Sequence, residues 1–357
     1  MPIKIDYAAA ERVLLEALTT AKTGSGLPVE WISHAKTVFA LEHKTWTPAL
    51  ATLLLAKATD ERVDALSIKA EASNPNAYSL RGLGHKIVVP AALEHNFSIR
   101  NTGREPLNNQ PFFRYDRIDK IDRVRNSDDL SYFLDIAKSA DRLSAEQAKF
   151  ALASFLKVAL DISAKAQRVK VKTDGLTPVG VRVATEDFLR YDATDRPQRL
   201  QAFAAACLDL LFDEVKTRRI NDPSRDFPGD VHALDGSTLV LAMEVRGKAV
   251  SQADLSSFAR SCAEADLHRA VMFVDAPQQP ELDARSVSRE AGLEDVQVEL
   301  FKCAADLLLS VLLWAHLPQG KAIQMFSQGI LTRLREIEVS IPTLEEWARA
   351  VAVAQAK

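Results

Sequence analysis

The stretch that decides the fold reads Pro228-Gly-Asp230-Val-His-Ala-Leu234, then Asp235-Gly-Ser-Thr238, then Leu239-Val-Leu-Ala-Met-Glu244-Val-Arg246-Gly-Lys248. Two apolar runs flank an Asp-Gly pair, which is a strong local signal for two antiparallel strands joined by a tight turn. Side chains alternate between the two faces of a strand, so Glu244, Arg246 and Lys248 would share a face, with Asp230 opening the first strand nearby. Two carboxylates and a cation are therefore expected to converge at one end of this hairpin.

The elements around the hairpin can be predicted from their periodicity. Ser251 can cap a helix that runs to about Asp266, and residues 269–274 follow as a further strand. We predict a preceding helix over about 199–219. On its helical wheel Glu214 falls inside the apolar stripe, where a carboxylate needs a partner or a metal because burying a bare charge is costly.

This order of elements is that of the PD-(D/E)xK nuclease core, in which an Asp precedes a hairpin that carries an acidic residue and a cation. Hydrolysis of a phosphodiester at neutral pH requires charge neutralisation and a hydroxide, and carboxylate-bound Mg²⁺ supplies both. A hairpin whose charges simply face water would give the same pattern. The hairpin alone therefore leaves a nuclease site and a solvated surface open.

Composition limits the class of protein. The chain has 357 residues, of which 47% are apolar and 26% charged, which is ordinary for a globular protein of about two domains. Its net charge of −3 excludes a uniformly basic nucleic-acid-binding protein, so contact with DNA would need a local patch. Cys207, Cys262 and Cys303 lack metal-ligand spacing and suggest a reduced, intracellular protein. Neither a signal peptide nor a membrane-spanning run is recognisable.

The order of elements predicts an α/β (α+β) protein in three parts. Residues 1–194 form a mainly helical region with helices near 7–22, 29–42, 46–58, 127–139 and 144–170, the last opened by a capping box at Ser144. Short β-like runs over 170–194 mark the boundary. Residues 195–318 form the nuclease-like core, a central mixed sheet flanked by helices, with a last strand at 296–301 and a helix at 304–315. A helical tail, 319–357, carries a second expected capping box from Thr343 to Glu346.

Residues 74–126 have the composition of a shaped loop surface, rich in Gly, Pro, Asn, Arg and aromatic residues. From 81 to 125 there are nine Lys and Arg against five Asp and Glu, a local excess of 9 − 5 = +4. A solvated charged surface would give the same count. As a phosphate-facing patch, this stretch would contact DNA through Arg81, Arg104, Arg114 and Arg117, with Asn108, Asn109 and Gln110 as further candidates for base contacts.

Three motifs in order carry a resemblance to a known family. They are Ala77-Tyr-Ser-Leu-Arg81-Gly-Leu-Gly-His85-Lys-Ile-Val-Val-Pro90, Gly103-Arg-Glu-Pro-Leu-Asn-Asn-Gln-Pro-Phe112, and Gly229-Asp230 through Glu244-Val-Arg-Gly-Lys248. Together they resemble the SacI-type family of type II restriction endonucleases, over roughly residues 40 to 280. The resemblance implies Mg²⁺-dependent cleavage of double-stranded DNA at a short sequence by a homodimer in the cytoplasm of a prokaryote.

Carried over residue by residue, the resemblance makes Asp230 and Glu244 the metal ligands. The sequence departs from the family pattern two residues after Glu244, where Arg246 stands in place of the usual lysine and Lys248 follows two residues later. Arginine stays protonated and cannot act as a base, so we expect Lys248 to contribute more to cleavage. Two alternatives remain open at this point: a structure-specific repair nuclease on the same core, and a DNA-binding protein whose nuclease site has decayed.

Overall fold

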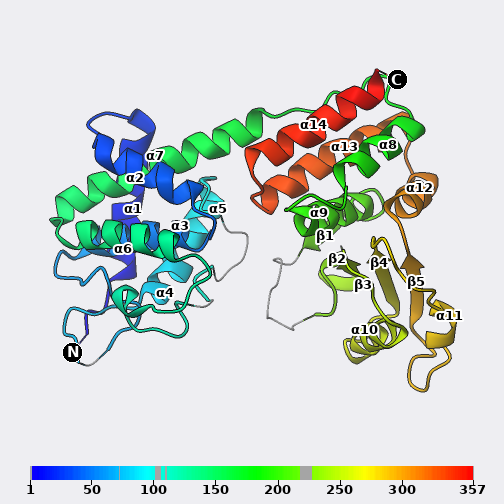
Figure 1. Cartoon of the computed structure of the whole chain (residues 1–357), viewed down its shortest axis with the longest axis horizontal. Coiled ribbons are helices and arrows are strands. Elements are labelled where there is room, and N and C mark those ends of the chain that lie inside the picture. The colour runs from blue at the N-terminus through cyan, green and yellow to red at the C-terminus, as the bar shows by residue number, and fades with distance from the viewer. Residues whose placement is uncertain (1, 72, 101–105, 109–110, 218–226, 357) are drawn as a thin grey trace. The chain divides into compact units, whose positions relative to one another are not determined.

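The structure is a computed structural model that describes residues 2–71, 73–100, 106–108, 111–217 and 227–356 (Figure 1). The chain forms two compact units, residues 1–167 and 168–357. The division falls before residue 194, where composition suggested a boundary. The reason is that residues 170–194, expected as short β-like runs, hold helix α8 (Pro178–Phe188), which packs on α14 (Ile341–Gln355) in the second unit.

The first unit is helical, and its predicted helices are confirmed. They are α1 (Tyr7–Thr23), α2 (Val29–Ala40), α3 (Trp46–Thr59), α6 (Ser127–Asp141) and α7 (Ala145–Arg168). The predicted capping box is also present, because the Gln147 amide N–H donates to the Ser144 hydroxyl (3.2 Å) and the Ser144 N–H donates to the Gln147 side chain (3.0 Å).

Helix α3 forms the centre of the first unit. Every residue from Trp46 to Ala58 is buried, as expected of a helix that is apolar on all sides. Trp46 stacks on Phe133 of α6, with ring centroids 4.7 Å apart, and meets the edge of Phe112 at 5.7 Å. These aromatic contacts tie the stretch around Phe112 to the core.

Residues 74–126 are less loop-like than their composition suggested. They contain α4 (Leu80–Leu83), a π-helical turn (Gly84–Val88), α5 (Val89–Glu94) and a 3₁₀ turn (Ile118–Lys120). Tyr78, Leu83 and Val88 are fully buried. The prediction of a surface loop is therefore wrong for residues 77–94, where local Gly and Pro signals gave way to tertiary packing.

The second unit contains a five-stranded mixed sheet in the order β1-β2-β3-β4-β5. The strands are β1 (Glu214–Thr217), β2 (Val231–Asp235), β3 (Thr238–Arg246), β4 (Arg269–Val274) and β5 (Gln297–Phe301). Strands β1, β2 and β3 pair antiparallel, and β3, β4 and β5 pair parallel. The predicted α/β fold with a mixed sheet is confirmed.

Helices cover both faces of this sheet (Figure 1). One face packs on α10 (Gln252–Glu264), through Leu255 and Ala259 against Ala242 and Met272. The Ser251 side chain caps α10 in a capping box, as predicted, and the crossover from β3 to β4 runs through this helix.

The opposite face packs on α9 (Arg196–Leu208), whose Phe203 lies 5.3 Å from Phe273 of β4. After the sheet come α12 (Ala304–Trp314) and α13 (Gln319–Glu336), and a short α11 (Ala284–Val287) precedes β5. None of the helices in the described ranges is both long and apolar enough to cross a membrane.

Two local predictions in this unit are wrong. The helix expected over 199–219 ends at Leu208, and the chain then turns into β1. The capping box expected at Thr343 is absent, because α14 begins three residues earlier with Ser340 as its cap and the Thr343 hydroxyl contacts Asp195. In both cases long-range packing moved a boundary that local signals placed elsewhere.

Candidate active site

The β2–β3 hairpin brings the two predicted carboxylates to the same end of the sheet. Strand β2 begins at Val231, opposite Met243, and the Asp230 carboxylate just before it accepts a hydrogen bond from the N–H of Val245, the residue after Glu244 (3.0 Å). At the other end of the hairpin Asp235 pairs with Thr238, which confirms the predicted tight turn.

Gly229 permits the close approach of the two strands next to Asp230. Its φ of 82° lies in the left-handed region, and a Cβ there would come within 2.9 Å of the Met243 carbonyl oxygen. The Asp230 N–H donates to that same carbonyl at 2.8 Å. A side chain at position 229 would therefore displace Asp230 from the end of β3.

Asp230 is anchored through its side chain and its backbone. Its Oδ2 accepts a hydrogen bond from the Val245 N–H (3.0 Å), and its carbonyl accepts one from Gln201 Nε2 of α9 (3.3 Å). Gln201 is itself buried. The first carboxylate is thus fixed against the backbone of the residue that follows Glu244.

Glu244 faces helix α10. It shares a strand face with Ala242, which packs against α10. Burial and, secondarily, the charge of Glu244 raise the pKa of the Cys262 thiol on that helix to about 12. The Glu244 side chain is only 13% exposed, and its Oε1 forms an ion pair with the Arg246 guanidinium, which is 53% exposed. A largely buried carboxylate therefore meets a cation whose other side is open to solvent.

Arg246 is the last residue of β3, and Lys248 lies beyond the strand. The expectation that Lys248 continues on the same strand face is wrong, because β3 ends at Arg246 and residues 247 and 248 form a bend. Lys248 is exposed there. The structure gives the contact with Glu244 to Arg246 and not to Lys248.

Glu214 is not part of this group. It lies on β1 opposite Leu234, at the far end of β2 from Asp230, and is exposed. Its carboxylate pairs with Lys216 at 2.9 Å. The prediction of a core-facing carboxylate on a helix is therefore wrong, because the segment is a strand and its side chains follow a period of two.

His232 has a structural contact. It is 7% exposed, and its Nε2 lies 2.7 Å from the Pro228 carbonyl oxygen. This contact fastens the segment that enters β2. His232 therefore shapes the start of the strand on which Asp230 sits.

The donor set fits a hard divalent cation. Asp230 and Glu244 offer carboxylate oxygens near the end of the hairpin, and Mg²⁺ is commonly held by one or two carboxylates together with water and substrate oxygens. Among the residues that the structure describes, no three His, Cys, Asp or Glu side chains form a metal-binding group.

In the first unit, Arg81 and Asn108 of the predicted DNA-contacting residues lie together. Arg81 Nη2 donates to Asn108 Oδ1, and the Arg81 guanidinium carbon lies 4.9 Å from the centroid of the exposed Phe113 ring. This cation–π contact and the hydrogen bond hold the guanidinium in one orientation. Arg114 is exposed beside Tyr115.

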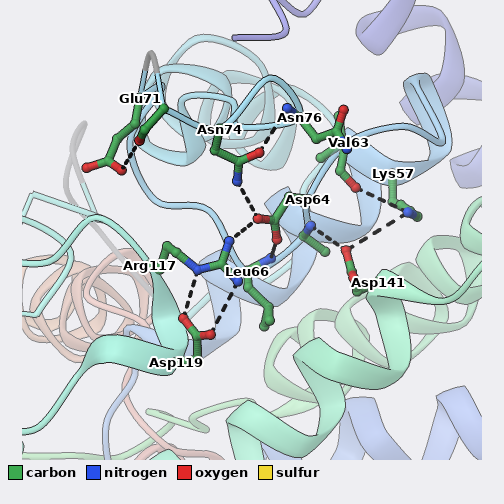
Figure 2. Close-up of polar contacts among 12 residues, drawn as sticks. Lys57, Val63, Asp64, Leu66, Glu71, Asn74, Asn76, Arg117, Asp119 and Asp141 are labelled. Atoms are coloured by element: carbon green, nitrogen blue, oxygen red, sulfur yellow. Dashed lines mark hydrogen bonds and ion pairs between the residues drawn. The ribbon is translucent and has the colours of Figure 1, made fainter.

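Arg117 is held inside the first unit. Figure 2 shows its guanidinium between Asp64 and Asp119, with Nε donating to Asp119 Oδ1 at 3.0 Å and Nη1 paired with Asp64. Asn74 Nδ2 donates to the same Asp64 carboxylate at 2.7 Å. This arrangement gives Arg117 a structural role in the first unit. The remaining predicted contacts, Arg104, Asn109 and Gln110, lie outside the described residues.

Sequence reasoning did not single out two buried side chains of α9 that touch the backbone of the site. One is Gln201, which binds the Asp230 carbonyl, and the other is Arg196, which binds the Gly247 carbonyl (3.2 Å). The helix had been placed from residue 199, so Arg196 fell outside it. Asp195 followed by Pro197 is a helix-start signal that would have moved the boundary to include Arg196.

Comparison with known proteins identifies the family. A family model described as the SacI restriction endonuclease N-terminal domain matches residues 9–163, which correspond closely to the first compact unit. The type II restriction enzyme SacI of Streptomyces achromogenes is 38% identical over 359 aligned residues, which cover 98% of each chain. The similarity therefore extends through both units.

Proposed function

The chain belongs to the SacI restriction endonuclease family, and from this premise we propose that it is a type II site-specific deoxyribonuclease. It would hydrolyse phosphodiester bonds of double-stranded DNA at a short recognition sequence with Mg²⁺, on a PD-(D/E)xK core formed by α9, the β1–β3 sheet, α10 and β4. The observation that carries the proposal is the contact of the Asp230 carboxylate with the Val245 N–H, next to Glu244 and its ion pair with Arg246.

Asp230 and Glu244 would hold the metal ion. Two neighbouring carboxylates repel one another unless a cation lies between or beside them. Bound Mg²⁺ would neutralise charge on the scissile phosphate and acidify the attacking water. The hydrogen bond from the Val245 N–H and the anchoring of the Asp230 carbonyl by Gln201 keep the first carboxylate in place without the ion.

Arg246 would bind the substrate. Its guanidinium is permanently charged and has a forked set of donors that suits two phosphate oxygens, while it cannot remove a proton from water. The half-exposed guanidinium can contact Glu244 on one side and a phosphate on the other. Lys248, on the bend beyond Gly247, would contribute charge to the same phosphate backbone.

The first unit would recognise DNA and the second would cut it. Asn108 and Phe113 hold the Arg81 guanidinium in a fixed orientation. Arginine is the side chain that most often binds guanine edges. The exposed cations of the stretch, Lys86, Arg114, Lys120, Arg123 and Arg125, supply charge for phosphate contacts. Arg104, Asn109 and Gln110 remain candidates for the same surface.

A digest of plasmid DNA tests the proposal. Purified protein with Mg²⁺ should give discrete bands, sequencing of the ends should give one short common motif, and chelation of the metal should stop cleavage. Cleavage restricted to branched or damaged DNA would replace this proposal with a structure-specific repair nuclease. Retained DNA binding without any cleavage would mean that the site has decayed.

Cleavage of both strands of a symmetric site is simplest with two active sites related by a two-fold axis, so we expect a homodimer. Light scattering at micromolar concentration should give twice the monomer mass, and the monomer mass with and without DNA would contradict this. We expect the protein to act in the cytoplasm of a prokaryote.

A further inference from the structure

We propose that Arg196 is a positioning residue for the catalytic end of β3: it fixes the backbone on the carboxyl side of Arg246 and thereby the direction in which Glu244 and Arg246 face. This inference rests on the proposed function. Arg196 lies at the first turn of α9 and is 6% exposed.

The Arg196 guanidinium uses three nitrogens on three separate backbone carbonyls. Nε donates to Leu189 (3.0 Å), Nη1 to Gly247 (3.2 Å) and Nη2 to Asp275 (2.7 Å). Nη2 also lies 3.4 Å from the Asp275 carboxylate. The planar guanidinium spreads its donors over three nitrogens in a fixed fork that spans separated carbonyls, whereas the ammonium of a lysine concentrates its donors on one nitrogen.

Two further contacts hold the guanidinium and its partner in place. The guanidinium carbon lies 4.3 Å from the centroid of the Tyr191 ring, and the Tyr191 hydroxyl donates to Asp275 Oδ1 at 2.9 Å. Asp275 is itself buried. Arg196, Tyr191 and Asp275 thus form a closed group at the carboxyl ends of β3 and β4.

The group formed by Arg196, Tyr191 and Asp275 fixes the backbone carbonyls of Arg246 and Gly247. The Asp275 N–H donates to the Arg246 carbonyl at 2.9 Å, and Arg196 binds the next carbonyl, that of Gly247. Arg246 is the residue that pairs with Glu244, and Lys248 follows the fixed carbonyl directly. The direction of both cations therefore depends on where Arg196 holds this backbone.

Gly247 is required for the contact. A Cβ at this position would lie 2.9 Å from Arg196 Nη1 and 3.1 Å from Leu200 Cδ1. A larger residue would push the bend away from α9 or displace the guanidinium. The close packing of Arg196 against this bend therefore explains the glycine between Arg246 and Lys248.

The burial of Arg196 also favours a positioning role. A buried ion pair often contributes no more stability than apolar side chains of similar volume. What a buried arginine adds is directional bonding, and here the bonds converge on the strand end that carries Glu244 and Arg246. The same helix contains an arginine without that connection, which supplies a matched control.

Arg199 is that control. It is 4% exposed, stacks at 4.5 Å on the Phe188 ring and donates to the Phe188 carbonyl at 2.8 Å. Its remaining contacts are ion pairs with Asp195 and Glu346, none of which touches β3. Loss of either arginine removes a buried guanidinium from α9, but only Arg196 contacts the candidate site.

The test compares R196K with R199K and G247A with G320A, all in the full-length protein. Gly320 lies in α13, where an added Cβ meets no atom within 4 Å. Single-turnover cleavage with saturating Mg²⁺ should fall by about 100-fold in R196K, the effect of a misplacement of roughly 1 Å. R199K and G320A should cut near the wild-type rate. G247A should resemble R196K, and the double variant R196K/G247A should be no slower than R196K, because both changes break one contact.

Hydrogen exchange gives a measurement that does not depend on activity. The amides of residues 246–248 and of Asp275 should exchange faster in R196K and G247A than in R199K, while DNA binding in Ca²⁺ stays at the wild-type level. Equal exchange and equal cleavage in R196K and R199K would overturn the inference. If wild-type protein cuts no DNA, the proposed function falls, and the exchange comparison still decides whether Arg196 holds this segment.

Discussion

The charged groups around Asp64 in the first unit and those at the end of the β2–β3 hairpin are arranged in opposite ways. Around Asp64, opposite charges alternate: Arg117 lies between two carboxylates (Figure 2). Asn74 donates to the Asp64 oxygen that also pairs with Arg117, and the Leu66 N–H donates to the other oxygen. At the hairpin end, the Asp230 carboxylate lies at the Val245 N–H, next to Glu244, and Arg246 contacts Glu244. The first arrangement is self-sufficient, whereas the second would gain from an added cation.

This difference distinguishes charges that stabilise the fold from charges that form a functional site. Pairing inside the protein stabilises the fold, and breaking such a pair destabilises it. Like charges held together by the backbone cost stability unless a ligand neutralises them, so they indicate a site. Removing a charge should therefore have opposite consequences in the two regions.

The largest expected effect follows from removing a carboxylate at the hairpin end. D230N and E244Q should each lower single-turnover cleavage by at least about a thousand-fold, which corresponds to roughly 4 kcal/mol of lost metal-assisted stabilisation. Urea unfolding should show unchanged or slightly higher stability for D230N, because a repulsion is removed. Wild-type cleavage by either variant would show that the carboxylates do not hold the metal.

The next effect concerns the two cations after Glu244. R246A should lower cleavage by about 100-fold, a value typical of losing one group that stabilises charge in the transition state. K248A should have a smaller effect, because Lys248 is exposed beyond the strand. R246K should recover part of the rate, since it restores the charge without the fork. The reverse order, with K248A inactive and R246A active, would return the catalytic role to Lys248.

The network around Asp64 should respond through stability. D64N and R117A should each lower the free energy of unfolding by about 2 kcal/mol, less than the 3–5 kcal/mol of a fully buried pair because both side chains retain some exposure. Urea denaturation measures this directly. For the folded fraction of both variants, we expect the salt dependence of DNA binding to equal that of the wild type. A lower salt slope in R117A at unchanged stability would instead make Arg117 a phosphate contact.

The smallest expected effect is that of an exposed cation in the first unit. R114A should weaken DNA binding modestly and lower the slope of log K against log salt by about one, as for the loss of one phosphate contact. Its stability should equal that of the wild type. A fluorescence titration over a range of salt concentrations measures the slope, and the same slope in R114A and wild type would remove Arg114 from the interface.

Much of the second unit could be predicted from local signals. The Asp-Gly turn, the Ser251 cap and the apolar runs of β3 and β4 each depend on a few neighbouring residues, and the structure confirms all of them. The register near Asp230 does not follow from the turn, because a β-bulge between Ala233 and Leu234 shifts the pairing of β2 with β3 by one residue. The hairpin and its two carboxylates were therefore visible in the sequence, and their relative placement was not.

Other features depend on residues far apart in the chain. Glu214 was placed on a helix because the apolar spacing before it continued a helical period, but strand pairing with β2 decided the conformation. The pairing of Arg117 spans 53 residues to Asp64, and the contact of Arg196 with the Asp275 carbonyl spans 79. No local pattern encodes such partners.

The sequence by itself determined the hairpin, its two carboxylates, the capped helix after it and the family resemblance, because each is carried by residues close together in the chain. Only the tertiary structure decided which charges are paired within the protein and which cation meets Glu244. It also decided which arginine of α9 holds the strand end. The physical reason is that charge and hydrogen-bond partners are chosen by proximity in space, which chain order does not specify.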